Sequence, residues 1–356
     1  MSNTPHSGRG ANHNPPNRFT QIDLERDPEF YEGAFLDEWG ARPATQFLED
    51  SSRSVVATND SPDLPMEATL NPYRGCEHGC SYCYARPGHE YLGFSAGLDF
   101  ETRVLVKREA PRLLREHLMK PSYKPVTISL SGVTDCYQPV ERQLGITRGC
   151  LEVFLDFRHP VGIVTKNFLV TRDIDLLSRL ARWNCVHVLL SITTLAPDLA
   201  RRMEPRAASP ARRLEAVRRL TEAGVPCSVT VSPVIPGLND HELPAIIAAA
   251  AEAGALNAHY IPLRLPGAVV PVFTAWLEEH FPDRVDKVLD RVRSMRGGKL
   301  NDANFHSRFR GEGPLAHSMA QLYRLAQRKA GLPRPVKRLT TEHFRRPGPQ
   351  QLDLFS

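Results

Sequence analysis

Short runs of apolar and β-branched residues alternate with helical patterns from about residue 67 to residue 264. This rhythm is typical of βα units stacked around a parallel sheet. We predict strands at 68–73, 126–131, 161–165, 185–192, 225–231 and 256–261, with helices between them near 109–119, 146–158, 171–182, 209–223 and 240–253. A closed barrel of this kind needs eight units. The predicted fold class is therefore α/β, a partial (βα)6 TIM-like barrel with an N-terminal extension and a C-terminal helical and basic extension.

Two predicted strands alternate apolar residues with small hydroxyl residues, as around Ser129 in the second strand and Ser228 in the fifth. Successive side chains of a strand point to opposite faces, so one face packs on helices and the other presents hydroxyls. This pattern predicts that the interior of the barrel is accessible to water and holds a polar ligand. The alternative is that a terminal extension covers this face and the hydroxyls bond to backbone.

The flanking segments differ in composition from this core, which we place at residues 67–264. Residues 1–20 are polar and rich in Asn, Pro and Gly, which predicts a disordered arm, and residues 21–66 predict an extension packed on the core. Residues 265–332 predict two further helices, near 272–295 and 315–330, with a basic segment between them. The proline-rich residues 333–356 predict a flexible tail.

The 356 residues, of which 41% are apolar, suit one large domain with appendages. Lys and Arg outnumber Asp and Glu by 45 to 40, an excess too small to identify a partner. No apolar run reaches membrane-spanning length and the first residues do not resemble a signal peptide, so we expect a cytoplasmic protein. Seven cysteines in an unpaired pattern also favour a reducing compartment.

The candidate chemistry begins in the loop after the first strand. Cys76, Cys80 and Cys83 have the spacing CxxxCxxC, and neighbouring glycines let the loop curl so that the sulfurs converge on a soft metal centre. A structural zinc ion needs a fourth ligand, for which His78 or His89 is available. A [4Fe–4S] cluster needs only these three, because one iron can stay without a protein ligand.

With Tyr82 before the third cysteine and Tyr84 after it, the motif resembles the signature of the radical S-adenosylmethionine (SAM) superfamily. The flanking residues NPYRGCEHGCSYCYAR resemble the branch that contains spore photoproduct lyase, and the resemblance covers about residues 54–264. It implies a [4Fe–4S] cluster whose open iron binds SAM, and reductive cleavage of SAM to a 5′-deoxyadenosyl radical. It further implies that both tyrosines lie beside the cofactor, and that a donor such as a flavodoxin or ferredoxin supplies the electron.

The resemblance also implies SAM contacts at the carboxyl ends of the later strands, where barrel-like folds gather their reactive groups. Ser131 and Asp135 are expected to meet the SAM amino group, although Asp135 also suits a plain turn. Lys166 is expected to bind the SAM carboxylate or ribose, and Ser191 to contact the same cofactor. The segment that starts at Ser232 resembles the apolar motif beside the adenine.

A fourth cysteine, Cys136, lies in the turn after the second strand. Spore photoproduct lyase has a cysteine in the matching turn that donates a hydrogen atom to the product radical. The resemblance therefore makes Cys136 a candidate catalytic residue, and the alternative is a buried bystander. Cys150 and Cys227 fall among apolar residues and are predicted core thiols, and Cys185 has no predicted role.

Two C-terminal features indicate a nucleic-acid partner. From Arg291 to Arg310 there are six basic residues and one acid, interleaved with Phe305 and Phe309, a pattern suited to phosphates and bases. The alternative is a solvated loop whose phenylalanines face the core. The tail ends in Gln351-Leu352-Asp353-Leu354-Phe355, which resembles the pentapeptide that binds the replicative sliding clamp, unless the tail folds back on its own domain.

These features together predict a radical SAM enzyme that acts on nucleic acid, with a damaged or modified base in DNA as the expected substrate. Two alternatives stay open. One keeps the radical chemistry but places it on RNA or protein. The other is a non-catalytic, metal-stabilised protein that binds DNA or the clamp.

Overall fold

The main sheet of the computed structural model, which describes residues 8–19, 44–64, 66–335 and 337–348, has the strand order β10-β9-β8-β7-β6-β3-β2. All neighbouring pairs are parallel except β2 (Val56–Thr58) against β3. The parallel strands are β3 (Ala68–Leu70), β6 (Ile128–Leu130), β7 (Val161–Thr165), β8 (Val186–Ser191), β9 (Cys227–Val234) and β10 (Ala258–Pro262). The partial barrel of six βα units predicted from the sequence is thereby confirmed.

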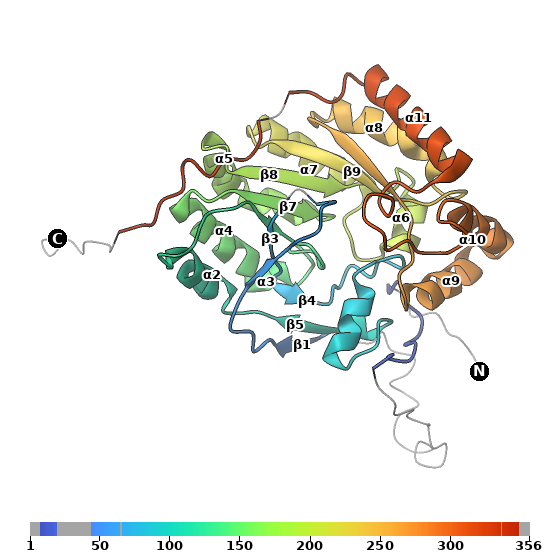
Figure 1. Cartoon of the computed structure of the whole chain (residues 1–356), viewed down its shortest axis with the longest axis horizontal. Coiled ribbons are helices and arrows are strands. Elements are labelled where there is room, and N and C mark those ends of the chain that lie inside the picture. The colour runs from blue at the N-terminus through green and yellow to red at the C-terminus, as the bar shows by residue number, and fades with distance from the viewer. Residues whose placement is uncertain (1–7, 20–43, 65, 336, 349–356) are drawn as a thin grey trace, which may run out of the picture.

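Helices cover the outer face of this sheet (Figure 1). They follow the predicted pattern, with α11 packed on α8. Their bounds are α2 (Ala110–Met119), α4 (Ile146–Phe157), α5 (Ile174–Arg182), α7 (Pro210–Glu222), α8 (Leu243–Glu252) and α11 (Gly313–Lys329). Shorter elements are α1 (Asp99–Thr102), α3 (Glu141–Leu144), α6 (Pro197–Met203), and the 3-10 helices η2 (Arg86–Leu92), η3 (Phe168–Asp173) and η4 (Asp240–Glu242). In the described ranges, no helix combines the length and apolar character that crossing a membrane requires.

A second, three-stranded sheet was not predicted. It has the order β1-β5-β4, formed by β1 (Gln46–Glu49), β5 (Arg103–Val106) and β4 (Tyr73–Arg74). Strands of two to four residues carry too few alternating positions to stand out in a sequence. Because β4 directly precedes the cysteine loop, this small sheet fixes where that loop begins.

Residues 8–19, which we call the N-terminal strap, pack against the cysteine loop. The backbone N–H groups of Gly10 and Ala11 donate to the two carboxylate oxygens of Glu101, at 3.1 and 2.9 Å. A Cβ atom on Gly10 would lie 1.5 Å from the carbonyl oxygen of Gly79, so only glycine fits this contact. The predicted disorder of the arm is therefore wrong for residues 8–19. Composition suggested disorder, whereas contacts with Glu101 and Gly79, which are distant in sequence, hold this stretch in place.

The helix predicted at 272–295 is two helices, α9 (Val269–His280) and α10 (Val285–Ser294), joined by η5 (Pro282–Arg284). The break lies at Phe281, whose φ of −146° is not helical. A residue before proline is disfavoured in the α region, so Pro282 was the sequence signal for the break. The last helix ends as predicted, with Gly331 in the left-handed conformation at φ +65°.

Residues 337–348, the longer described part of the predicted tail 333–356, are docked on the barrel. The Thr340 N–H donates to the Asn184 carbonyl at 3.2 Å, and the Phe344 ring packs on Tyr123, Phe157 and His159. These contacts lie before the strands begin, at the edge opposite the arrowheads in Figure 1. The alternative of a tail that folds back therefore describes this part. The pentapeptide Gln351–Phe355 lies outside the described residues.

Candidate active site

The cysteine loop runs between β4 and η2 and is folded inward. Cys76 and Cys80 are buried and Cys83 is half-buried. Gly75 and Gly79 have φ values of +86° and +66°, a region that glycine adopts without strain. A Cβ on Gly75 would also come within 2.9 Å of the Phe100 carbonyl oxygen. These two glycines let the chain turn back so that all three cysteines belong to one compact loop.

Arg86 holds the cysteine loop in place through hydrogen bonds to backbone carbonyls. Its guanidinium is fully buried and donates to the Cys80 carbonyl at 3.0 and 2.8 Å and to the carbonyls of residues 96 and 97. Glu101 pairs with the same guanidinium and also receives the strap. A buried charge of this kind is stable only when paired and fully hydrogen-bonded, as it is here. The loop is therefore held in one shape by its own polar contacts.

The donor set suits an iron–sulfur cluster. Burial raises the pKa of all three thiols, and the nearby Lys166 offsets part of that rise for Cys80 and Cys83. A soft metal centre would remove the cost of burying thiolates, because it binds sulfur in the deprotonated form. Together with the compact loop, three thiols without a fourth partner fit the three protein ligands that such a cluster requires.

The histidines considered for zinc have other partners. His78 Nδ1 lies 3.3 Å from Asp135 Oδ2, and the His89 ring packs on Phe94 and Phe100. Within the described ranges, no three His, Cys, Asp or Glu side chains are placed to hold a single metal ion.

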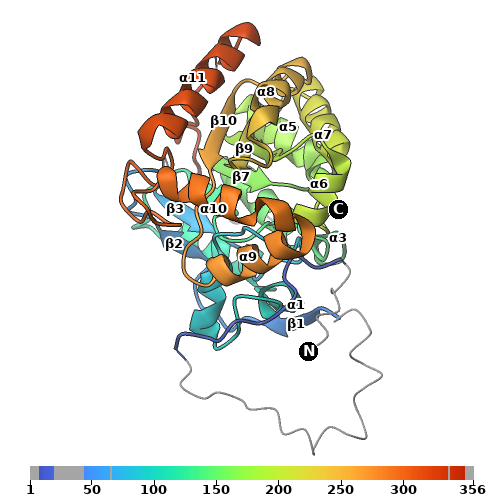
Figure 2. The same ribbon diagram turned by 90° about the vertical axis from the view of Figure 1, so that its right-hand side faces the viewer.

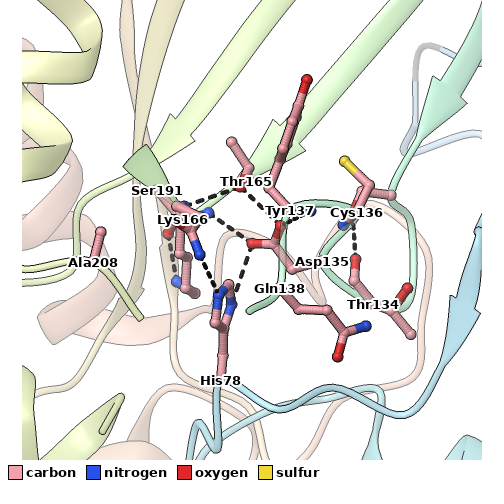
Figure 3. Close-up of polar contacts among 12 residues, drawn as sticks. His78, Thr134, Asp135, Cys136, Tyr137, Gln138, Thr165, Lys166, Ser191 and Ala208 are labelled. Atoms are coloured by element: carbon pink, nitrogen blue, oxygen red, sulfur yellow. Dashed lines mark hydrogen bonds and ion pairs between the residues drawn. The ribbon is translucent and has the colours of Figure 1, made fainter. Parts of the chain in front are cut away.

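Asp135 ties the turn after β6 to the strand end of β7 (Figure 3). Its Oδ1 accepts from Thr165 Oγ1 and from the backbone of Tyr137, both at 2.8 Å, and its Oδ2 accepts from the Lys166 N–H at 2.7 Å. Burial alone would raise the pKa of this carboxyl, but His78 and these hydrogen bonds hold it below its usual value. Asp135 therefore stays ionised, and its oxygens are already occupied by protein donors.

Lys166 lies where three strand ends meet. Its Nζ donates to Ser191 Oγ at 2.6 Å and approaches the Ser232 carbonyl at 3.5 Å and Glu204 Oε1 at 3.2 Å. The Ser232 hydroxyl bonds instead to Thr230, at 2.6 Å. The structure thus brings Lys166 and Ser191 together as the sequence suggested, whereas Ser232 takes part through its backbone.

Glu204, which the sequence analysis missed, is the centre of this network. Its fully buried carboxylate pairs with Arg213, accepts from the hydroxyls of Tyr82 and Thr193, and pairs with Lys166. Burial would raise the pKa of Glu204, but Arg213 and Lys166 outweigh it and hold the pKa well below its usual range. A Glu that follows a short helix is ordinarily exposed, so no local pattern marked it. The carboxylate links the aromatic residue of the cysteine loop to the cation at the strand ends.

The remaining predicted residues differ in their placement. The Ser131 hydroxyl closes its own turn, accepting from the Cys136 N–H at 2.8 Å and donating to the Thr134 carbonyl. Cys136 is fully buried in the hydrophobic core, and Figure 3 shows its sulfur pointing away from His78. Tyr84 is half-exposed and donates to the Gly132 carbonyl at 2.5 Å. The structure therefore places Cys136 with the core, as the bystander alternative predicted, and Tyr84 at the mouth.

Comparisons with known proteins agree on one family and fold. The profile of the Radical SAM superfamily matches residues 70–250. An uncharacterized protein of Mycobacterium tuberculosis is 36% identical over 232 residues, which are 65% of this chain and 68% of that protein. A radical SAM Nα-GlyT isomerase of Pseudomonas phage M6 is 22% identical over 207 residues, which are 57% of this chain and 40% of the isomerase. Spore photoproduct lyase in complex with dinucleoside spore photoproduct has a similar fold, with a TM-score of 0.59, 16% identity, and coverage of 81% of this chain and 80% of the other.

Proposed function

The chain belongs to the radical SAM superfamily and is a radical enzyme, and on that premise we propose that Cys76, Cys80 and Cys83 hold a [4Fe–4S] cluster. When bound, the cluster supplies the electron that cleaves SAM to a 5′-deoxyadenosyl radical. The observation that carries the proposal is the meeting of the compact cysteine loop with the Lys166–Glu204 network at one edge of the sheet. Reactive groups of barrel-like folds gather at that edge.

We assign roles to five residues around the cofactor. Lys166 presents a cation to the SAM carboxylate, and Ser191 and Glu204 fix where its ammonium lies. Asp135 acts through Lys166, since it binds the lysine backbone and has no oxygen left for a direct contact. Tyr82, tied to Glu204, covers the cysteine loop and limits water beside the sulfurs.

The proposed substrate is nucleic acid, with a lesion or modified base in DNA as the specific case. A protein with the same fold was solved with a dinucleoside photoproduct, which supports this class of substrate. The basic and aromatic segment 291–310 supports it independently, because its arginines suit phosphates and its phenylalanines suit bases.

Two further partners belong to the same proposal. An electron donor such as a flavodoxin or ferredoxin would reduce the cluster, and the pentapeptide Gln351–Phe355 would bind the replicative sliding clamp. The seven cysteines are free thiols, which supports a reducing, cytoplasmic location.

The test is product analysis with the anaerobically reconstituted enzyme, SAM, a reductant and a panel of oligonucleotides that carry damaged or modified bases. We expect 5′-deoxyadenosine together with one altered oligonucleotide. Cys80→Ala should abolish both products, and Cys150→Ala, which removes a buried thiol of α4 far along the chain from the loop, should abolish neither. Radical formation with no change in any oligonucleotide, but with a modified peptide or RNA, would contradict the DNA assignment.

A further inference from the structure

At the mouth of the barrel, aromatic rings alternate with arginine guanidinium groups over five side chains. We call these five the aromatic–arginine ladder: Tyr84, Arg264, Phe309, Arg308 and Phe305. The Arg264 Cζ atom lies 5.3 Å from the ring centre of Tyr84 and 5.5 Å from that of Phe309. The Arg308 Cζ atom lies 4.9 Å from the ring centre of Phe309 and 4.7 Å from that of Phe305. At these separations a guanidinium is attracted to the face of each ring.

The inner end of the ladder touches the candidate active site. Tyr84 directly follows Cys83, and its hydroxyl donates to the Gly132 carbonyl in the turn after β6. Arg264 comes just after the carboxyl end of β10. The ladder therefore starts beside the cysteine loop and leads outward along the carboxyl edge of the sheet.

The outer end is held by the loop between α10 and α11, which Figure 2 shows beside β2 and β3. Buried Arg296 donates to the carbonyls of Pro262 and Leu263, both at 2.8 Å, and to that of Arg308 at 3.0 Å. Burial and the nearby Arg264 lower the pKa of Arg296 to about 10, so it stays charged at neutral pH. Arg308 pairs in turn with Asp63 at 2.6 Å. The loop is thus fixed in place before any ligand arrives.

Two of the three aromatic rings of the ladder are open to solvent, and the third, Phe309, is partly buried. Tyr84 is 51% exposed and Phe305 is 50% exposed, and Val133 beside the mouth is 50% exposed. The alternative in which the phenylalanines face the core is therefore wrong for Phe305. Of the two arginines in the ladder, Arg308 pairs with Asp63, whereas Arg264 forms no ion pair with a carboxylate among the described residues. An exposed apolar surface of this kind, beside a cation such as Arg264 that has no carboxylate partner among the described residues, is typical of a site that a ligand covers.

We infer that the aromatic–arginine ladder binds a stretch of unpaired bases in DNA and guides it toward the cysteine loop. Aromatic faces stack on unpaired bases of any sequence, and arginines beside them neutralise the phosphates. In a duplex the bases are already stacked on each other, so this row of rings favours single-stranded or locally opened DNA. The inference rests on the proposed function and deepens it by giving the form in which the substrate is bound.

The first test removes the rings. The holoenzyme carrying Phe305→Ala and Phe309→Ala is titrated with a fluorescent 12-mer of thymidine nucleotides, and affinity is read by anisotropy. Each lost stacking face should weaken binding about tenfold, within the range known for base–aromatic contacts. Phe47→Ala, which removes an exposed ring from β1, is the matched control and should bind like the wild type. Iron content and melting temperature confirm that the variants are folded.

The second test separates charge from stacking. Arg264→Gln should lower the dependence of log affinity on log salt by about 0.7, the value for one phosphate contact on a single strand. Arg293→Gln, whose charge is paired with Asp290 at 2.7 Å on α10, should leave that slope unchanged.

The outcomes are distinct. Tight binding of the oligonucleotide by wild type and by the Phe305/Phe309 variant alike would overturn the ladder and leave the proposed function standing. Tighter binding of a matched duplex than of the single strand would also overturn it. If an RNA 12-mer bound as tightly as the DNA 12-mer, and lost affinity in the Phe305/Phe309 variant to the same extent, the choice of DNA would be overturned. No oligonucleotide binding by a wild type that still cleaves SAM would end the nucleic-acid assignment itself, and the ladder with it.

Discussion

Replacing Glu204 by glutamine isolates the charge at the centre of the buried network. Glutamine keeps the size and one acceptor oxygen of the side chain, so the packing around Tyr82 and Thr193 changes little. What disappears is the negative charge between Arg213 and Lys166. Arg213 is itself buried, and its other nitrogens already bond to the carbonyls of Ala208 and Ser191 at 2.7 and 3.0 Å.

The expected loss follows from leaving that guanidinium buried without a counter-ion. Removing one partner of a buried ion pair costs about 3–5 kcal/mol, and the retained oxygen of glutamine places Glu204→Gln near the lower value. For a chain of this size we expect a melting temperature lower by about 4 °C. Urea denaturation of the anaerobic holoenzyme measures the free energy of unfolding directly.

The control is Glu215→Gln, which removes the same charge beside two arginines of α7 but at the surface. Solvent screens such pairs, so its free energy of unfolding should change far less than that of the Glu204 variant.

The wild type and Glu204→Gln should also differ in how their stability depends on pH. The pKa of Glu204 is lowered in the folded state, so its contribution is present above the unfolded value of about 4.3 and is lost as pH falls below it. The wild type should therefore lose more stability than Glu204→Gln between pH 5 and the acid limit. Equal stability and equal pH slopes in the two proteins would refute an ionised carboxylate at this position.

Three other predictions follow from particular contacts. Gly10→Ala should displace the N-terminal strap from Gly79, cost about 1 kcal/mol for each hydrogen bond lost and speed iron loss in air, whereas Gly88→Ala, which meets no neighbour, should not. Cys136→Ala should lower the free energy of unfolding by about 1 kcal/mol and leave the products unchanged, and an altered product would restore its role as hydrogen donor. Phe344→Ala should expose residues 337–348 to limited trypsin digestion; a fragment pattern like the wild type's would show that this ring does not hold the tail.

The barrel was predictable because its pattern is repeated and local. Each parallel strand alternates or concentrates apolar residues, and helices such as α4 bury one face at helical spacing, with Cys150 and Phe154 fully buried. The strand limits differ from the predicted ones by up to three residues, as in β9, which continues to Val234. The cysteine motif was visible for a related reason, since its spacing is contained in eight residues.

The features that were not predicted depend on contacts between distant segments. Glu204 acquires its role only when Tyr82, Lys166 and Arg213 are brought around it from other elements. The strap and the docked tail have compositions typical of disorder, and only their partners on the barrel order them. The sequence left both interpretations of Cys136 open, because it places a residue in a turn but does not say which way the side chain points.

The most direct test of the central claim is electron paramagnetic resonance of the anaerobically reduced protein with and without SAM. The proposal predicts a reduced [4Fe–4S] signal that changes when SAM is added, because the iron without a protein ligand is where SAM binds. It also predicts that the signal is lost in Cys76→Ala, Cys80→Ala and Cys83→Ala. A protein that binds no iron, or a cluster signal that SAM leaves unchanged, would contradict it.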